Sequence, residues 1–149
     1  MSQEEIRQAL GRAQLFKESL LRELVSFPER KSSDTDRDFA HAYARRILVD
    51  TPQVQILLLS WSEGQWAEVH EHDVACGFTV LQGQALETHF EKIGAGYARA
   101  TGTHTHDLGS LLVTGAGYCH QLGAAPGSRL VTVHVYTPAL RSRPLQVVA

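Results

Sequence analysis

The first 27 residues have apolar side chains at helical spacing. Ser2 and Glu5 stand three residues apart at the start of this pattern, which is the spacing of a capping box at a helix N-terminus. Pro28 cannot continue a helix and marks its end. The pattern therefore predicts a helix up to the proline. The apolar positions that define it are Ile6, Leu10, Ala13, Leu20 and Leu24.

A second helix is predicted after the polar segment RKSSDTD. Asp36, the last residue of that segment, is a suitable N-cap because its carboxylate can accept from the first N–H groups of a helix. The N-terminal part, residues 1–50, is therefore expected to be helical. The residues in the second helix would include Phe39, Ala40, Tyr43 and Ile47.

From Val54 onward the pattern changes to short runs that are rich in β-forming residues. Turns that contain glycine, such as SEG, LQG, IGAG and AAPG, separate these runs. Strands at this spacing, without helices between them, are typical of an all-β sandwich or barrel. We expect a single domain over residues 1–149, with the barrel at 51–140 and a tail at 141–149. The runs are VQILLLSW, AEVH, FTVL, ALETHF, SLLV and RLVTVHVYTP.

Composition and charge narrow the function classes. The 149 residues carry a formal net charge of −2, which gives no electrostatic footprint for nucleic acid. No apolar run approaches the length of a membrane-spanning helix, and the charged residues at 1–14 do not resemble a signal peptide. Two cysteines are too few for a disulfide framework. We expect a cytoplasmic protein that binds neither nucleic acid nor membrane; its oligomeric state cannot be predicted.

Two pairs of histidines are separated by a single residue. His70 and His72 lie in a predicted strand, where alternate side chains face the same side, so they can share one metal ion. Glu71, between them, is expected to point away. The second pair, His104 and His106, lies among Gly, Thr and Asp, and we expect these two side chains at the surface.

The first pair belongs to a longer motif. Gly64, His70-Glu71-His72, Cys76 and Gly83 have the spacing of the first cupin motif, with cysteine where many cupins have glutamate. The segment GSLLVTGAGYCHQLGA has the spacing of the second cupin motif and supplies His120. The resemblance implies a cupin double-stranded β-helix, or jelly-roll barrel, preceded by two short helices. It also implies that His70, His72 and His120 hold a metal ion inside the barrel.

Further motifs resemble the thiol dioxygenases of the cupin superfamily, in particular the cysteine dioxygenase family. In chain order, and in the family's order, they are YARRIL before the barrel, WSEGQWAEVHEH, which leads into and includes the histidine pair, and TVHVYTP near the C-terminus. The resemblance covers roughly residues 39–140 and implies oxidation of L-cysteine to cysteine sulfinic acid by O₂. Three neutral histidines without a carboxylate suit Fe(II) and leave open positions, although they could also hold zinc, nickel or copper.

The resemblance also assigns roles to individual residues. Arg45 would grip the substrate carboxylate with its planar guanidinium, and Tyr43 would orient the same carboxylate. The alternative is that Arg45 lies exposed on a helix. Thr132, His134 and Tyr136 alternate along a strand and would form a hydrogen-bonded relay toward the iron. Thr132 stands where the family has serine.

Cys76 and Tyr136 match a pair that is joined by a thioether bond in animal members of the family. The sequence therefore predicts this crosslink in a fraction of the molecules, against the alternative that Cys76 is a small buried thiol. Cys119 is expected to pack in the core, and His89 to lie at the surface or on a helix face.

Two alternative functions stay open. The first is a dioxygenase for 3-mercaptopropionate or a related thiol acid; such relatives typically have glutamine where this chain has Arg45. The second is a cupin that binds a metal and a small ligand without catalysis, since cupins include non-enzymes.

Overall fold

The computed structural model describes residues 2–25, 44–127, 129–137 and 142–148. Two helices come first, α1 (Gln3–Leu15) and α2 (Lys17–Val25). The predicted capping box is present: the Glu5 N–H donates to Ser2 Oγ at 3.1 Å, and the Ser2 N–H donates to the Glu5 carboxylate at 3.1 Å. The single helix predicted here is interrupted at Phe16, so both helices come from one predicted element.

The sequence pattern predicted a second helix that includes Ile47, but Ile47 lies in a strand. The residues of the predicted helix up to Tyr43 lie outside the described part of the chain. Ala44–Asp50 forms strand β1, which pairs antiparallel with β2 (Gln55–Trp61) across a turn closed by the Thr51 N–H donating to the Val54 carbonyl at 2.9 Å. The run ILV is β-branched or aliphatic, and its pairing with β2 decides the local structure. The sheets therefore begin before residue 51.

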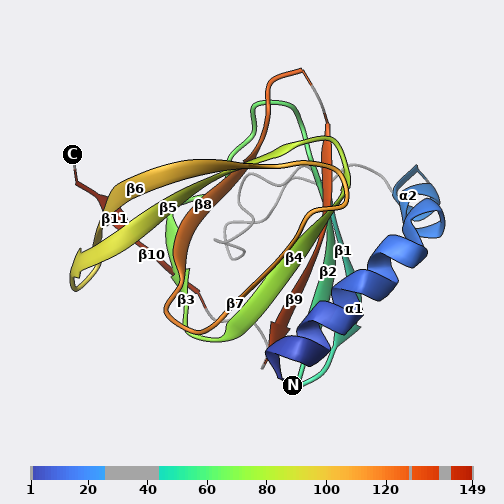
Figure 1. The fold of residues 1–149 in the computed structure, drawn as a ribbon, viewed down its shortest axis with the longest axis horizontal. Coiled ribbons are helices and arrows are strands. Elements are labelled where there is room, and N and C mark those ends of the chain that lie inside the picture. Colours follow the sequence, from blue (N-terminus) through green and yellow to red (C-terminus); the bar gives the residue numbers. More distant parts are fainter. Residues whose placement is uncertain (1, 26–43, 128, 138–141, 149) are drawn as a thin grey trace.

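Two sheets form the rest of the described chain (Figure 1). A five-stranded sheet has the order β1-β2-β9-β4-β7, and a six-stranded sheet has the order β10-β3-β8-β5-β6-β11. The mainly β fold that the sequence predicted is confirmed. The remaining strands are β3 (His70–His72), β4 (Ala75–Gln82), β5 (Ala85–Gly94), β6 (Tyr97–His106), β7 (Leu111–Thr114), β8 (Cys119–Ala124), β9 (Leu130–Thr137), β10 (Ser142–Pro144) and β11 (Gln146–Val147).

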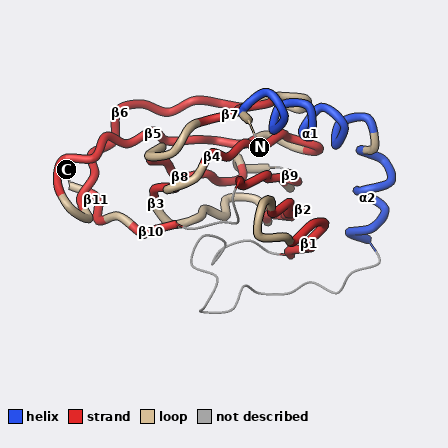
Figure 2. Tube along the Cα trace, turned by 90° about the horizontal axis from the view of Figure 1, so that it is seen from below, coloured by secondary structure: helices blue, strands red, loops and turns tan. Residues whose placement is uncertain are grey.

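The five-stranded sheet is buried on both faces. Leu57 and Leu59 of β2 pack into the core between the sheets, whereas Leu58 packs with Ile6 and Leu10 of α1 on the outer face. Figure 2 shows α1 running along the side of the molecule that carries β7 and β4. This explains why the LLL run of β2 does not alternate between apolar and polar residues.

Helix α1 approaches the sheet closely at Gly77 of β4. A Cβ atom at this position would lie 2.7 Å from the Leu112 carbonyl oxygen and 2.9 Å from Leu10 Cδ1. The glycine therefore allows the helix to pack directly on the backbone of β4. Neither helix of the described chain is long and apolar enough to cross a membrane.

Candidate metal centre

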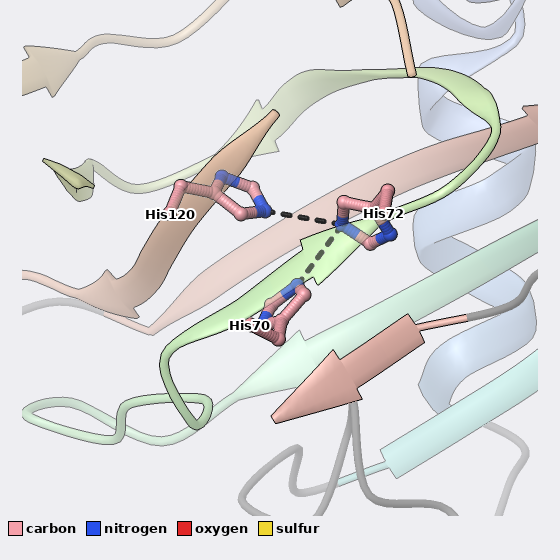
Figure 3. Close-up of side chains that lie close together, drawn as sticks. All are labelled: His70, His72 and His120. Atoms are coloured by element: carbon pink, nitrogen blue, oxygen red, sulfur yellow. Dashed lines mark hydrogen bonds between the residues drawn. The ribbon is translucent and has the colours of Figure 1, made fainter. Parts of the chain in front are cut away.

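The three predicted metal ligands come together inside the barrel. His70 and His72 lie on β3 and His120 on β8, and the antiparallel register places His70 opposite His120. Figure 3 shows the three rings facing one another. The Nε2 atoms of His70 and His72 are 2.9 Å apart, and those of His72 and His120 are 3.2 Å apart. All three side chains are buried, so the group could hold a metal ion.

Hydrogen bonds at the far side of two rings determine which nitrogen faces the centre. His70 Nδ1 lies 2.6 Å from the Glu68 carbonyl oxygen, and His120 Nδ1 lies 2.7 Å from Glu87 Oε2. Both partners accept, so Nδ1 carries the hydrogen in each ring and Nε2 presents a lone pair to the centre. His72 Nδ1 is the one buried side-chain nitrogen or oxygen in the described residues without a hydrogen-bond partner.

The protonation state of the cluster suits a metal. Burial, together with the neighbouring His120, lowers the pKa of His70 to about 3. Burial and the neighbouring histidines also lower the pKa of His72 well below its usual value. Neutral imidazole is the form that binds metal. A cation at the point shared by the three Nε2 lone pairs would bind all of them. The three histidines therefore fit the metal ion that the cupin motifs imply.

The carboxylates beside the histidine pair do not join this centre. Glu71 lies on the opposite face of β3, as expected, but it is buried there, and its Oε1 accepts from Lys92 Nζ at 3.1 Å. Asp73 is exposed. The donor set is therefore three imidazoles, which suits Fe(II) among several divalent metals.

A chain of buried hydrogen bonds runs along β9. The Trp61 indole N–H donates to Thr132 Oγ1 at 3.1 Å, Thr132 Oγ1 lies 2.8 Å from His134 Nε2, and His134 Nδ1 lies 3.2 Å from the Tyr136 hydroxyl. Indole can only donate, so the Thr132 hydroxyl accepts from Trp61 and can use its own hydrogen toward His134 Nε2. In that tautomer His134 carries its hydrogen on Nδ1 and donates to the Tyr136 hydroxyl oxygen.

Tyr136 ends this chain beside the histidines. Its ring centroid lies 5.3 Å from that of His72. Cys76 of β4 is its direct partner in the antiparallel register, so the two side chains lie on the same face of the sheet. Cys76 Sγ lies 3.3 Å from Thr114 Oγ1. The structure therefore brings the two residues of the predicted crosslink next to each other.

Arg45 lies on a strand rather than on a helix. It pairs with Leu59, whose side chain belongs to the core between the sheets, so the Arg45 side chain leaves the strand on the inner face. Arg46 pairs with Leu58 on the outer face. Arg46 Nε lies 3.3 Å from a carboxylate oxygen of Glu23 on α2. The two adjacent arginines are thus separated by the sheet. Tyr43, the other residue assigned to the substrate carboxylate, lies outside the described residues.

Sequence reasoning missed Glu87, which is fully buried on β5. Besides His120, its carboxylate contacts His106 Nε2 at 2.8 Å, His89 Nε2 at 2.9 Å and the Tyr118 hydroxyl at 3.0 Å. Burial raises the pKa of Glu87, but the hydrogen bonds from His106 and His120 outweigh it and hold the pKa below its usual value. The sequence carried no local signal for this role, because a single glutamate in a strand has the pattern of an exposed residue.

These contacts correct two expectations about histidines. His106 and His89 were both expected at the surface, yet each is at least partly buried and hydrogen-bonded to Glu87. The register explains the position of His106. This residue pairs with Ala85, and Ala85 and Glu87 lie on the same inner face of β5, so the His106 side chain lies on that face too. His104 is exposed as expected. Cys119 packs with Val69, Ala98 and Leu145, as expected for a core cysteine.

No family model matches the sequence. The fold is similar to that of a cupin 2 domain-containing protein from Halorhodospira halophila, with a TM-score of 0.56 and 14% identity, over 81% of each chain. A cupin-like protein from Thermotoga maritima gives a TM-score of 0.54 and 17% identity, over 70% of this chain and 77% of that one.

Oxalate decarboxylase from Bacillus subtilis, an enzyme with Mn(II) centres, gives a TM-score of 0.52 and 18% identity, over 62% of this chain and 24% of that one. Cupin neighbours therefore include metal-dependent enzymes. Identities this low show the fold and leave the reaction to the residues of the site. The chain has the cupin fold, with three buried histidines that could hold a metal ion.

Proposed function

We propose that the protein is a non-haem iron thiol dioxygenase that oxidises L-cysteine to cysteine sulfinic acid with O₂. The observation that carries this proposal is the hydrogen-bond chain from Trp61 through Thr132 and His134 to Tyr136, which ends beside the three histidines. A barrel that only binds a metal has no need for a tyrosine whose oxygen is held by a buried, neutral histidine.

The protein contributes three buried imidazole nitrogens in a fixed arrangement. His70, His72 and His120 would hold the iron and leave positions open for other ligands. Fe(II), when bound, would supply the positions at which the thiol and O₂ meet and would activate O₂, while the four electrons that reduce O₂ come from the sulfur of the thiol. The burial of these side chains lowers the local dielectric, which would strengthen the electrostatic interactions within the centre.

Tyr136 would donate a hydrogen bond to the reacting substrate. Burial lowers the pKa of His134 to about 3 and keeps this histidine neutral. In the tautomer with its hydrogen on Nδ1, His134 would donate to the Tyr136 hydroxyl oxygen, and the Tyr136 hydroxyl would donate to the substrate. Thr132 serves as well as serine would, because its hydroxyl makes both contacts that the relay needs.

Arg45 would bind the substrate carboxylate. The register starts its side chain from the inner face of the sheet, on the side of Thr132 and His134. A guanidinium can make two parallel charge-assisted bonds to a carboxylate, which favours an amino acid or thiol acid as substrate. The partners of the protein would accordingly be a small thiol and O₂.

The pairing of Cys76 with Tyr136 supports the thioether crosslink as part of this proposal. Its formation would break the S–H bond and one ring C–H bond, form one S–C bond and reduce O₂ by two electrons to hydrogen peroxide, which takes up both hydrogens. A tryptic map of protein expressed with iron tests it. Only unmodified peptides of both residues would eliminate the crosslink, without affecting the proposed main reaction.

The experiment that tests the proposed function is O₂ uptake by Fe(II)-loaded protein with L-cysteine, followed by mass spectrometry of the product. We expect one sulfinate for each O₂ consumed, and loss of this activity in Arg45→Ala. An Arg46→Ala variant is the matched control, because Arg46 lies on the outer face with Glu23. Uptake with 3-mercaptopropionate in preference to cysteine would change the substrate, and no uptake with either thiol would favour a non-catalytic cupin.

A further inference from the structure

We infer that Glu87 is a positioning residue of the metal centre, which holds His120 with Nε2 toward the metal and supplies the negative charge that the three histidines lack. This inference rests on the metal binding that the proposed function requires, but not on the thiol chemistry. It concerns a residue of β5, a strand that carries no ligand itself.

The register places Glu87 where it can reach His120. On the paired strands β5 and β8, His89 lies opposite His120 and Glu87 lies opposite Leu122, so all four side chains share one face. Glu87 Oε2 approaches His120 Nδ1 to 2.7 Å, and the carboxylate is fully buried. A short bond between an ionised carboxylate and an N–H group is among the stronger hydrogen bonds in proteins.

Glu87 is itself held in place. Its Oε1 contacts His106 Nε2 and His89 Nε2, while its Oε2 contacts the Tyr118 hydroxyl as well as His120 Nδ1. Four contacts match the roughly four lone-pair directions of a carboxylate. The orientation of the group is therefore fixed, and a fixed acceptor fixes the orientation of the His120 ring.

His120 differs in this respect from the other two ligands. His70 Nδ1 contacts a backbone carbonyl oxygen, and His72 Nδ1 has no hydrogen-bond partner among the described residues. A carboxylate behind a histidine raises the basicity of its metal-binding nitrogen and stabilises one tautomer. It also offsets one of the two positive charges of a divalent ion in a buried, low-dielectric site.

Glu87→Gln tests the inference, because glutamine keeps the shape and one oxygen acceptor but removes the charge. We would measure Zn(II) affinity by competition with a chelator, since Zn(II) suits imidazole ligands and does not oxidise. The variant should bind Zn(II) about 10- to 100-fold more weakly than the wild type. Glu71→Gln is the matched control: Glu71 is also buried, but it lies on the opposite face of β3 with Lys92, and its loss should leave the affinity close to that of the wild type.

The tautomer of His120 gives a second readout that a merely structural role would not move. In ¹⁵N-labelled wild-type protein, with and without Zn(II), the His120 ring should carry its hydrogen on Nδ1, with the strong downfield proton shift of a bond to a carboxylate. That proton should move upfield in Glu87→Gln, because a neutral amide oxygen accepts more weakly. In Glu71→Gln it should stay in place.

The outcomes separate the inference from the proposed function. A wild-type protein that binds no Zn(II) would overturn the metal centre and this inference together. Equal affinity of wild type and Glu87→Gln would overturn the inference alone and leave thiol oxidation to be tested. If Glu87→Gln does not fold, the wild-type spectrum decides, since a hydrogen on Nε2 of His120 in the metal-free protein would rule out the positioning role.

Discussion

At the scale of single residues, the properties of the site follow from which nitrogen of each histidine carries the hydrogen. His70 and His120 are oriented by acceptors behind them, a backbone carbonyl oxygen and the Glu87 carboxylate. If the Thr132 hydroxyl donates to His134 Nε2, His134 presents an N–H group to Tyr136 instead of a lone pair. Histidines of one site can then play opposite roles, as metal ligands and as a hydrogen-bond donor.

Tyr136→Phe should retain metal binding and lose activity. Phenylalanine preserves the packing against His72 but removes the hydroxyl, and groups that transfer or share a proton in a transition state contribute about 10²-fold or more to rate. We expect kcat/KM for cysteine to fall by that factor with little change in metal affinity. Tyr97→Phe, at an exposed position on β6, should leave both unchanged. Full activity of Tyr136→Phe would remove the tyrosine from the mechanism.

The buried His134 should make stability depend on pH. Burial lowers its folded-state pKa to about 3 from 6.5 in the unfolded chain, so the unfolded state binds the extra proton between these values. Its contribution is therefore complete above pH 6.5 and is lost as the pH falls toward 3, with a slope of at most about 1.4 kcal/mol for each pH unit. In metal-free protein, His134→Gln should flatten the pH dependence of the unfolding free energy by up to this slope. The exposed His104→Gln should retain the wild-type dependence, and an unchanged slope in His134→Gln would contradict the assignment.

At the scale of elements, the five-stranded sheet determines the secondary structure of the segment that pairs with its edge. The sheet is buried on both faces, because its inner face packs in the barrel and its outer face is covered by α1. Residues 44–50 pair along β2 and so become its edge strand. The arginines of this strand show the consequence, since Arg45 and Arg46 end on opposite faces with different surroundings.

Gly77→Ala should weaken the packing of α1 on β4. The added methyl group would lie 2.7 Å from the Leu112 carbonyl oxygen and 2.9 Å from Leu10 Cδ1, and the backbone oxygen cannot move aside easily. We expect a loss of about 1–3 kcal/mol in the free energy of unfolding, measured with urea. Gly11→Ala is the matched control within α1: a methyl group there meets nothing within 4 Å, so the variant should be more stable by about 0.5–1 kcal/mol. A neutral Gly77→Ala would contradict the close approach.

At the scale of the whole molecule, the centre joins segments that are far apart in the sequence. The ligands come from β3 and β8, the carboxylate behind them from β5, and the tyrosine beside them from β9. These strands belong to both sheets, so the centre lies where the two sheets face each other. Metal bound there would stabilise the folded barrel as a unit, because the unfolded chain does not hold the three histidines together.

Zn(II) or Fe(II) should therefore raise the thermal stability of the protein. At a free metal concentration about 100 times the Kd, the expected stabilisation is about 2.7 kcal/mol, seen as a higher Tm by calorimetry. His120→Ala should abolish this increase in Tm, whereas the exposed His104→Ala should retain it. An identical increase in both variants would place the metal elsewhere.

Much of this centre was predictable from local sequence patterns. Alternation along a strand was enough to put His70 and His72 on one face, and Thr132, His134 and Tyr136 on another. The second motif added His120 at the right distance along the chain. Glu87 could not be found in this way, because a single glutamate in a strand looks like an exposed residue until its pairing partners are known.

The sequence by itself determined the strand-rich barrel and the capping box at Ser2, because each depends on a repeat or spacing within a short segment. The resemblance to the two cupin motifs added the three histidines that could hold a metal. Only the tertiary structure decided that residues 44–50 form a strand, that His89 and His106 turn inward, and that Glu87 lies behind His120. The physical reason is strand register: it places residues from distant segments opposite each other, and a buried carboxylate or imidazole is stable only beside the partners that this register supplies.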